Sequence, residues 1–240
     1  MKGIILAGGL GKRLHPLTKI TNKHLLPIYN KPMIYYPLMT LVNASITDLL
    51  IVTGGHYAGE FLRLLGTGKE FGLKKINYTY QEGEGGIAAA LSLAEDFADG
   101  EKIVVILGDN IIEKSILTHV ETFKKQEKGA LILLQEIEQP ERFGVPVLKE
   151  NNLVIIEEKP QKPQSPYAVT GIYMYDETVF EIIRGLSPSE RNELEITDVN
   201  NEYISRGEMN HAILDGWWTD AGTFDSLLLA NNLIAQISSV

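Results

Sequence analysis

A glycine-rich segment with two adjacent cations is the first group of residues that could bind a ligand. Residues 6–14 have the sequence Leu-Ala-Gly-Gly-Leu-Gly-Lys-Arg-Leu and continue an apolar run at residues 3–7. Glycines after a strand let the backbone approach a phosphate closely, and successive N–H groups can form a nest for an anion. Lys12 and Arg13 add positive charge beside that nest. A tight glycine turn has the same pattern, so the segment alone indicates only a candidate phosphate site.

Two aspartates could hold a metal ion. Asp109 follows residues 102–108, at the carboxyl end of a predicted central strand, where open α/β sheets place their ligands. Asp220 lies in the segment Trp-Trp-Thr-Asp-Ala-Gly-Thr at residues 217–223. Either carboxylate could instead accept amide hydrogen bonds in a loop or turn. Carboxylates distant in sequence can nevertheless converge on one Mg²⁺, which prefers oxygen ligands.

Two familiar phosphate-binding motifs do not match the glycine-rich segment. A Walker A loop needs GxxxxGK followed by Ser or Thr, but Leu6 occupies the first glycine position and Arg13 follows Lys12. A dinucleotide fingerprint needs GxGxxG and an acidic residue about 20 positions later. Leu14 occupies its third glycine position, and residues 29–30 carry no acid. A dinucleotide-dependent oxidoreductase is therefore disfavoured.

The elements that must position these residues alternate between strands and helices along the first 110 residues. Strands are predicted for short apolar runs, and helices for the longer stretches between them. The rhythm favours a parallel sheet with helices on both faces. The predicted strands are residues 3–7, 48–53, 76–81 and 102–107, and the predicted helices are residues 32–44, 60–65 and 86–97.

The rest of the chain is richer in strands. We see no repeat, low-complexity tract or linker, so we expect one α/β domain over residues 1–240. Its Rossmann-like central sheet should be mixed and mostly parallel, flanked by helices, with the later strands in a separate lobe. The later strands are predicted at residues 130–136, 144–148, 154–158 and 167–175, and helices at 176–184, 197–206 and 223–235, the last capped by Thr223.

Composition excludes several classes of protein. The formal net charge of -9 argues against broad nucleic-acid binding, which needs clustered Lys and Arg. The absence of cysteine removes disulfides, thiolate nucleophiles and Cys-type zinc sites. The apolar run near Met1 is too short for a signal peptide or membrane span. We therefore expect a cytoplasmic protein that does not act at a membrane.

Further motifs extend the glycine-rich segment. It has the form GGxGxRL and is followed by Pro-Leu-Thr at residues 16–18, Asn-Lys-His-Leu-Leu-Pro at 22–27 and Lys-Pro-Met at 31–33. In this order and spacing, the chain resembles the sugar nucleotidyltransferase family. The resemblance covers nearly the whole chain, since family motifs recur at residues 108–110, 141–145, 157–160, 169–173, 191–198 and 217–223. It is closest to the members that make dTDP-glucose.

The resemblance implies an activity as well as a fold. Such enzymes transfer a thymidylyl group from dTTP to α-D-glucose 1-phosphate by in-line displacement at the α-phosphorus, with Mg²⁺, and release pyrophosphate. The attacking sugar phosphate is largely dianionic near neutral pH, since its second pKa is about 6. No general base is needed, so the missing Ser-His-Asp arrangement is no objection. The family also implies a homo-oligomer, with residues 1–110 binding nucleotide and the strand-rich lobe in residues 111–240 binding sugar phosphate.

The family pattern assigns roles to particular residues. Asp109 and Asp220 match the Mg²⁺ ligands, and Arg13, Lys23 and Lys159 match the catalytic cations. A guanidinium can bind phosphates bidentately and never loses its charge, which suits Arg13 to the β- and γ-phosphates. The nucleotide-binding set is Leu6, Gly8, Gly9, Gly11, Arg13, Lys23, Gln81, Gly86 and Asp109; the sugar-phosphate set is Gly144, Glu158, Lys159, Val169, Gly171, Tyr173 and Arg191.

Some positions depart from the family pattern. His24 stands where Gln is common, and Phe143 where Tyr is common. After Gln81, two prolines and an aspartate of the usual loop are replaced in the segment Glu-Gly-Glu-Gly-Gly at residues 82–86. This leaves open a preference for UTP, because an apolar pocket distinguishes a methyl group by only about 1–3 kcal/mol.

Other activities also remain open. The alternatives are transfer to another hexose 1-phosphate, and a non-catalytic nucleotide-sugar sensor. A sensor is disfavoured because Arg13, Lys23, Asp109, Lys159 and Asp220 are all present. Longer family members continue beyond the helix predicted at residues 223–235, so we expect weak or no feedback inhibition by a dTDP-sugar at a second site.

Overall fold

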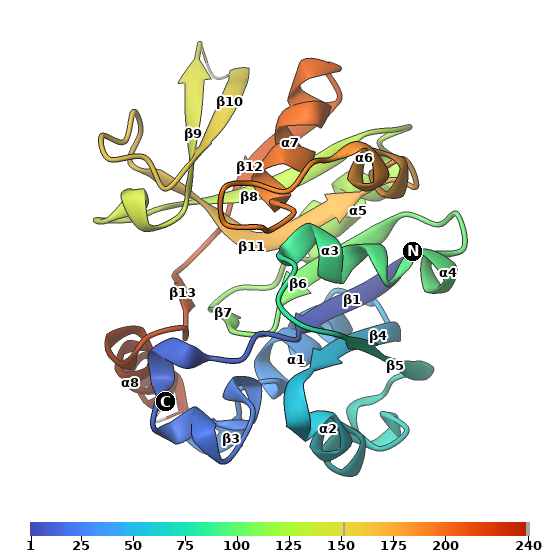
Figure 1. The fold of residues 1–240 in the computed structure, drawn as a ribbon, viewed down its shortest axis with the longest axis vertical. Coiled ribbons are helices and arrows are strands. Elements are labelled where there is room, and N and C mark those ends of the chain that lie inside the picture. The colour runs from blue at the N-terminus through green and yellow to red at the C-terminus, as the bar shows by residue number, and fades with distance from the viewer. Residues whose placement is uncertain (151, 239–240) are drawn as a thin grey trace.

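The computed structural model describes residues 1–150 and 152–238, and a seven-stranded sheet runs through it (Figure 1). β11 is antiparallel to both its neighbours, β6 and β8, whereas the other neighbouring strands are parallel. The predicted mixed, mostly parallel sheet is therefore confirmed. In spatial order the strands are β12 (Met209–Ile213), β8 (Ala130–Glu136), β11 (Tyr167–Tyr175), β6 (Ile103–Leu107), β1 (Lys2–Ala7), β4 (Asp48–Gly54) and β5 (Lys75–Gln81).

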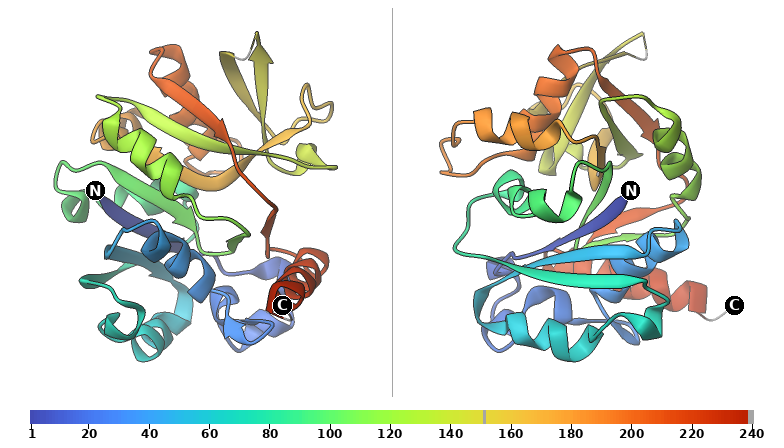
Figure 2. Two further views of the ribbon diagram at one scale, coloured as in Figure 1. Left: turned by 180° about the vertical axis from the view of Figure 1, so that it is seen from behind. Right: turned by 90° about the vertical axis from the view of Figure 1, so that its right-hand side faces the viewer.

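Helices cover both faces of this sheet. In β1, Ile4 and Leu6 enter one apolar cluster while Ile5 and Ala7 enter the other, because successive side chains of a strand point to opposite faces. This explains the unalternating apolar run at the start of the sequence. The rear view in Figure 2 shows α1 and α5 in front of the sheet, whereas α3, α6 and α7 lie in front of it in Figure 1. The helices are α1 (Tyr35–Asn43), α2 (Ala58–Leu65) and α5 (Leu117–Lys125) on one face, and α3 (Ile87–Ser92), α6 (Val179–Gly185) and α7 (Ile196–Ser205) on the other.

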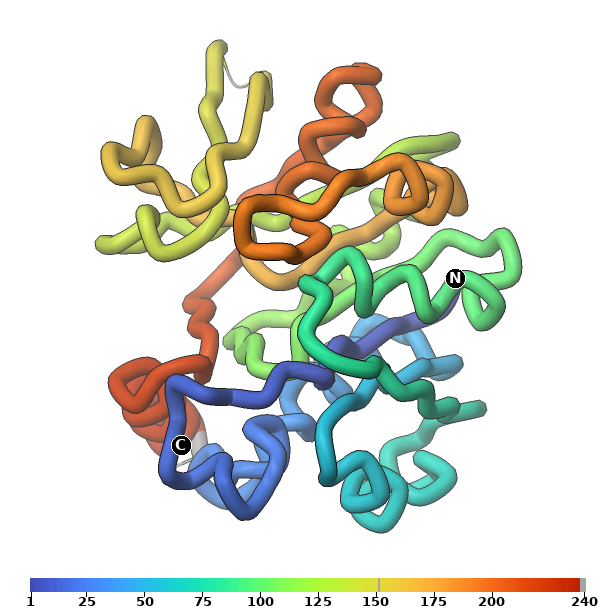
Figure 3. Tube along the Cα trace, viewed as in Figure 1, coloured from blue at the N-terminus to red at the C-terminus, as the bar shows by residue number. Residues whose placement is uncertain are grey.

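Short elements extend the fold beyond the carboxyl ends of β1 and β6. β2 (Pro27–Ile28) pairs with β3 (Lys31–Pro32), and β7 (Asn110–Ile112) pairs with β13 (Trp218–Asp220). The last helix, α8 (Phe224–Ser238), lies beside the segments that follow β1, as the tube in Figure 3 shows. A small apolar cluster that includes Leu14, Ile28 and Ala230 holds it there. The chain after the last large strand thus returns to the carboxyl edge of β1.

A hairpin projects from the second half of the chain beside α7 (Figure 1). β9 (Gly144–Lys149) and β10 (Asn152–Glu158) pair antiparallel to form it. Asn201 of α7 fixes the hairpin, because its Nδ2 donates to the Ile156 carbonyl over 2.9 Å and its Oδ1 accepts from the Ile156 amide over 2.8 Å. These contacts place the end of β10 over the sheet.

Several elements differ from the prediction. The helix expected at residues 86–97 is divided into α3 and α4 (Glu95–Ala98), because Leu93 and Ala94 leave the regular helix between them. The helix expected from residue 32 begins at Tyr35, since Pro32 belongs to β3. Helix α5 and strand β12 were not predicted: α5 buries only Val120 and Phe123, and β12 is a half-exposed edge strand without an apolar run.

The cap expected at Thr223 is confirmed. Its Oγ1 accepts from the Ser226 amide over 3.2 Å, and the Ser226 Oγ accepts from the Thr223 amide over 3.1 Å. Short 3₁₀ turns complete the fold at Lys12–Leu14, Leu17–Lys19, Lys23–Leu25, Gly55–Tyr57, Lys69–Phe71 and Pro140–Arg142. Over residues 1–150 and 152–238, none of the helices has the length and apolar character needed to cross a membrane.

Candidate active site

A cavity of about 710 Å³ lies at the carboxyl edge of the parallel strands, between the glycine-rich loop and the β9–β10 hairpin. Both halves of the chain contribute to its wall. Most of the residues selected from the sequence line it, although they are spread over more than 200 positions. The residues of the nucleotide and metal sets on the wall are Gly9, Gly11, Arg13, Lys23, Asp109 and Asp220; those of the sugar-phosphate set are Gly144, Glu158, Lys159, Val169, Gly171, Tyr173 and Arg191.

The two aspartates are brought together by backbone pairing. Asp109 stands between β6 and β7, and Asp220 is the last residue of β13. In the β7–β13 ladder Asp220 lies opposite Asn110, and the Ala221 amide donates to the Asp109 carbonyl over 2.9 Å. Two segments far apart in the sequence therefore present their carboxylates side by side.

Lys23 is paired directly with Asp109. Its Nζ donates to Asp109 Oδ2 over 2.5 Å, and the two side chains are only 11% and 12% exposed. Burial alone would raise the pKa of Asp109, but the Lys23 charge, with hydrogen bonds from Lys23 and Asn110, holds that pKa well below its usual range. Asp109 is thus ionised and able to bind a cation at neutral pH.

The environment of Asp220 has the opposite effect on its pKa. Burial and the nearby charge of Asp109 raise the pKa of Asp220, while Arg142 and Arg13 partly oppose the shift. Arg142 Nη2 lies 4.0 Å from Asp220 Oδ1. A Cβ on Gly222 would lie 2.8 Å from Asp220 Oδ2 and 2.9 Å from Arg13 Nη2, so both groups crowd against this glycine. The pair of carboxylates is surrounded by cations.

Two carboxylates beside an open cavity suit Mg²⁺. In the part of the chain that the structure describes, no group of three or more Asp, Glu, His or Cys side chains could hold a metal ion. Mg²⁺ is commonly held by one or two carboxylates, with water and substrate phosphates completing its octahedron. Asp109 and Asp220 provide that donor set.

His24 lies buried next to the Lys23–Asp109 pair. Burial, assisted by the charge of Lys23, lowers the pKa of His24 to about 3, so the imidazole is neutral at pH 7. Its Nδ1 lies 2.8 Å from Asn22 Oδ1, and a Cβ on Gly108 would lie 2.7 Å from its Cδ2. His24 therefore packs under the site as a neutral group.

Several sugar-phosphate candidates form a second polar cluster on the cavity wall. Glu158 Oε2 accepts from Thr197 Oγ1 over 2.7 Å, and its Oε1 lies 2.9 Å from Lys159 Nζ. Burial would raise the pKa of Glu158, but these contacts and Arg191 lower it overall. Glu158 is therefore a fixed, ionised acceptor, suited to hydroxyl groups.

Lys159 has a strained backbone. Its φ of 47° lies in the left-handed region, which a Lys rarely occupies. The Lys159 amide donates to the Phe143 carbonyl over 3.0 Å, which holds the turn in place. Strain of this kind often marks a functional position, because the surrounding structure must maintain it.

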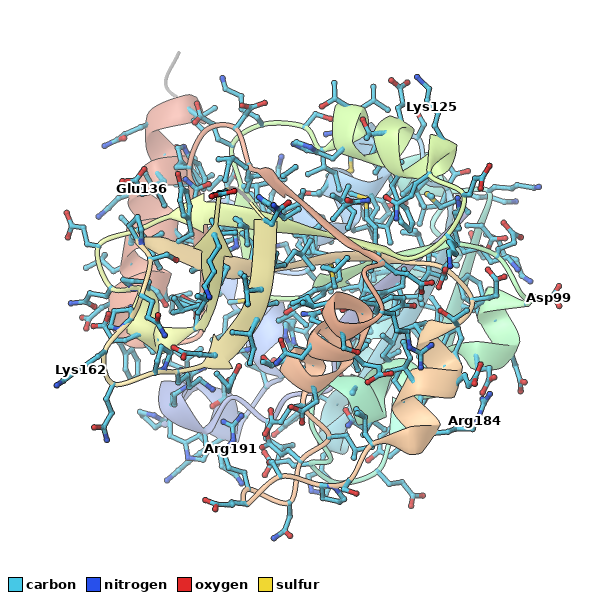
Figure 4. All side chains as sticks on the ribbon, turned by 90° about the horizontal axis from the view of Figure 1, so that it is seen from above. Asp99, Lys125, Glu136, Lys162, Arg184 and Arg191 are labelled. Atoms are coloured by element: carbon cyan, nitrogen blue, oxygen red, sulfur yellow. The ribbon has the colours of Figure 1, made fainter. Side chains whose placement is uncertain are left out.

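Arg191 is held by carboxylates at the rim of the cavity. Its guanidinium donates to both oxygens of Glu195, over 2.8 and 3.1 Å, and lies 3.5 Å from Glu158. Figure 4 shows Arg191 well apart from Arg184 on α6. Arg191 thus presents a positive group on the same wall as Lys159.

Two further wall residues were not selected from the sequence. Asn110 orients Asp109, donating to Asp109 Oδ1 over 3.0 Å while its own Oδ1 accepts from the Gly171 amide and the Trp218 Nε1 over 2.8 and 2.6 Å. Arg142 lies beside Asp220 and over the Phe143 ring. Both belong to family motifs at residues 108–110 and 141–145, which was the signal available for them.

The remaining nucleotide candidates lie off this wall. Gln81 Nε2 lies 3.5 Å from the Gly86 carbonyl, and a Cβ on Gly8 would lie 2.5 Å from Gln81 Oε1, so these three form a neighbouring group. Leu6 is buried in the core on the α3 face. The structure therefore brings Gln81, Gly8 and Gly86 together, and buries Leu6 in the core near the end of β1.

Comparison with known proteins relates this geometry to a family. The sequence pattern of the nucleotidyl transferase family matches residues 2–237. The chain is 44% identical over its whole length to a glucose-1-phosphate thymidylyltransferase of Neisseria meningitidis, of which it covers 84%. It is 43% identical to that of Mycolicibacterium smegmatis, covering 99% of this chain and 83% of the relative.

Solved structures agree with the sequence comparison. A crystal structure from Bacillus anthracis, assigned as a glucose-1-phosphate thymidylyltransferase in complex with a sucrose, superposes with a TM-score of 0.93. The match is 53% identical in sequence and covers 97% of this chain and 94% of that one. A UDP-glucose pyrophosphorylase with UDP-glucose shares the fold alone, at 24% identity, a TM-score of 0.84 and 98% coverage of both chains. The chain belongs to the nucleotidyl transferase family.

Proposed function

We propose that the protein transfers a thymidylyl group from dTTP to α-D-glucose 1-phosphate, giving dTDP-glucose and pyrophosphate. The observation that carries the proposal is one cavity lined by a carboxylate pair and by several cations. Arg13, Lys23, Lys159 and Arg191 all line it together with Asp109 and Asp220, so two anionic substrates can be held next to each other. The similarity to thymidylyltransferases along the whole chain supports this choice of substrates.

The chemistry is an in-line displacement at the α-phosphorus of dTTP. A phosphate oxygen of glucose 1-phosphate forms the new P–O bond, and the bond from the α-phosphorus to the bridging oxygen breaks, with both electrons leaving on pyrophosphate. The nucleophile is already an anion, so no protein group needs to remove a proton. Catalysis then depends on positioning and charge neutralisation.

The cations have separate tasks in this proposal. Lys159 and Arg191 hold the sugar phosphate, and Arg13 binds the β- and γ-phosphates bidentately. Lys23 turns from Asp109 to the α-phosphate, where the attacking oxygen arrives. Asp109 and Asp220 would hold Mg²⁺, which would supply charge neutralisation at the phosphates. The carboxylate of Glu158 accepts hydrogen bonds from the sugar hydroxyls.

Other groups would shape the substrate sites. Gly9, Gly11 and Gly8 give the triphosphate close access to backbone amides. Gln81 and Gly86 would bind the edge of the base above Leu6. Gly144, Val169, Gly171 and Tyr173 would surround the sugar; burial raises the pKa of Tyr173, so its hydroxyl stays protonated. We further propose a cytoplasmic homo-oligomer in which residues 1–110 bind the nucleotide and residues 111–240 bind the sugar phosphate.

Substrate choice is tested by pyrophosphate release. The purified protein is assayed with dTTP and UTP against glucose 1-phosphate, other hexose 1-phosphates and N-acetylated ones, with and without Mg²⁺. We expect Mg²⁺-dependent turnover with the highest kcat/KM for dTTP and glucose 1-phosphate. A preference for UTP above about tenfold, roughly 1.4 kcal/mol, would refute the thymidylyl assignment. Tight dTDP-glucose binding without turnover would identify a sensor.

A further inference from the structure

An ion pair bridges the two loops that flank the nucleotide half of the cavity. Lys12 Nζ lies 2.5 Å from Glu84 Oε2, although the residues are 72 positions apart. Both side chains line the cavity, and they are 65% and 46% exposed. Lys12 adjoins Arg13 in the glycine-rich loop, and Glu84 lies in the loop between β5 and α3. Neither residue has a role in the reaction described above.

The loop that carries Glu84 is anchored at both ends and free to adjust between them. Gln81 ends β5, and the Gly85 carbonyl accepts from the Leu194 amide over 2.8 Å. Between these anchors, Gly83 has a φ of 72°, and Gly86 beyond them has a φ of 91°. Glu84 therefore lies in a loop, residues 82–86, whose glycines allow the backbone to change conformation.

The position of this pair brings it into competition with a triphosphate. Arg13, the candidate ligand for the β- and γ-phosphates, is the next residue after Lys12. The phosphates would bring several negative charges close to the Glu84 carboxylate and offer Lys12 a stronger partner. An ion pair that is exposed on both sides is weak enough to exchange partners.

We propose that Lys12 is a further nucleotide-binding residue and that Glu84 is its exchangeable counter-charge. In the free protein the pair closes across the nucleotide half of the cavity. When dTTP binds, Lys12 leaves Glu84 and contacts the β- and γ-phosphates, while Glu84 moves outward with the loop of residues 82–86. Glu84 thus lowers the affinity for the triphosphate and leaves the affinity for the sugar phosphate unchanged. This inference rests on the proposed function.

Substitution of Glu84 tests the proposal, with a matched control at Glu95 in helix α4. Glu95 is similarly exposed, at 49%, and pairs with Arg184; neither residue lines the cavity. E84Q and E95Q each remove one negative charge. A difference in dTTP affinity between the two variants therefore reflects the position of the charge and not the change in net charge. We expect E84Q to lower the KM and the equilibrium Kd for dTTP about three- to fivefold, the effect of about one exposed ion pair. The KM for glucose 1-phosphate should stay within about twofold in both variants, and E95Q should change neither constant.

A double substitution identifies the route of the effect. K12Q alone should weaken dTTP binding, and in the K12Q background E84Q should change the dTTP Kd by less than about twofold. The proposal is wrong if E84Q leaves the dTTP Kd unchanged or raises it. It is also wrong if E84Q lowers the dTTP Kd by the same factor in the K12Q background as in the wild type. Binding is measured by calorimetry without sugar phosphate, so it is independent of turnover. If the wild type turns over dTTP and E84Q binds it no more tightly, only this inference fails; if the wild type neither binds nor turns over dTTP, the proposed function fails as well.

Discussion

Lys23 donates from Nζ to Oδ2 of Asp109 over 2.5 Å, in a pair that is almost completely buried. The second carboxylate, Asp220, has a looser ion pair, 4.0 Å long, with Arg142. The pKa of Asp109 is therefore held low, whereas burial and Asp109 raise the pKa of Asp220. Ionised Asp109 therefore stabilises the fold, whereas ionised Asp220 destabilises it. Substituting each aspartate should change the stability of the protein in opposite directions, although both have the same proposed role.

Asp109→Asn should reduce both activity and stability. The amide weakens the proposed Mg²⁺ site and leaves the buried Lys23 charge without its partner. We expect kcat to fall by at least about 100-fold, as when one group that stabilises transition-state charge is lost. The free energy of unfolding should fall by about 1–3 kcal/mol. Both are measured at pH 7, by pyrophosphate release over a range of Mg²⁺ concentrations and by urea denaturation.

The control for this variant is Asp225→Asn, which removes the same charge from an exposed position in α8. It should retain wild-type turnover. If D109N keeps more than about a tenth of the wild-type kcat while Mg²⁺ is still required, Asp109 is not the metal ligand.

Asp220→Asn should abolish activity but stabilise the fold at neutral pH. A raised pKa means that the folded state favours protonated Asp220, so its stabilising contribution is complete below the unfolded-state pKa and is lost as the pH rises through the folded-state pKa. At pH 7 the ionised group is unfavourable, and a neutral amide relieves this. We expect the Tm of D220N to exceed that of the wild type by about 2 °C at pH 7.

The difference in Tm should shrink as the pH approaches 4, because wild-type Asp220 then becomes protonated in the folded state. Thermal unfolding followed by circular dichroism across this range tests the sign. A D220N variant less stable than the wild type at pH 7 would show that the ion pair with Arg142 and the nearby charge of Arg13 outweigh burial.

The sequence predicted the strands that position Asp109, because buried parallel strands are continuous apolar runs with a ligand site at their carboxyl ends. It could not predict the contact with Asp220 from pattern alone. That contact depends on β7 and β13, each three residues long, which are too short to carry a periodic signal. Only the family resemblance connected the two aspartates.

Side-chain networks were less predictable than strands. Asn110 carries no distinct signal in the sequence, because a polar residue after a strand has many ordinary roles; its three partners are Asp109, Gly171 and Trp218. The Lys12–Glu84 pair joins two loops whose relative position depends on the whole sheet. Such contacts are set by tertiary structure, whereas propensity acts over a few neighbouring residues.

Substitutions at Lys159 should separate backbone strain from function. Lys159→Ala and Lys159→Gly both remove the ammonium, so we expect each to lower kcat/KM for glucose 1-phosphate about 10- to 100-fold, the loss of a charged hydrogen bond. Glycine accepts a φ of 47° without the Cβ clash that alanine suffers. The Gly variant should therefore be more stable than the Ala variant by about 1 kcal/mol.

The two Lys159 variants are compared by urea denaturation and by kinetics with varied sugar phosphate. Lys162, an exposed lysine farther along the same loop between β10 and β11, provides the control, and K162A should leave both measurements unchanged (Figure 4). Equal stability of K159A and K159G would contradict the strain, and wild-type kcat/KM in either would contradict the role in binding.

Gly222→Ala should impair catalysis through its two neighbours. The added Cβ would lie 2.8 Å from Asp220 Oδ2 and 2.9 Å from Arg13 Nη2, which is closer than such contacts allow. Both side chains must shift, and a misplacement of about 1 Å in a catalytic group can cost about 100-fold in rate. We therefore expect kcat to fall about 10- to 100-fold and the KM for dTTP to rise, with the KM for glucose 1-phosphate unchanged.

Gly59→Ala in α2, where a Cβ meets no atom within 4 Å, is the matched control and should keep full activity. Wild-type kcat and dTTP KM in G222A would show that Arg13 and Asp220 do not need their observed positions, and would remove the geometric basis for assigning them to the triphosphate and the metal ion.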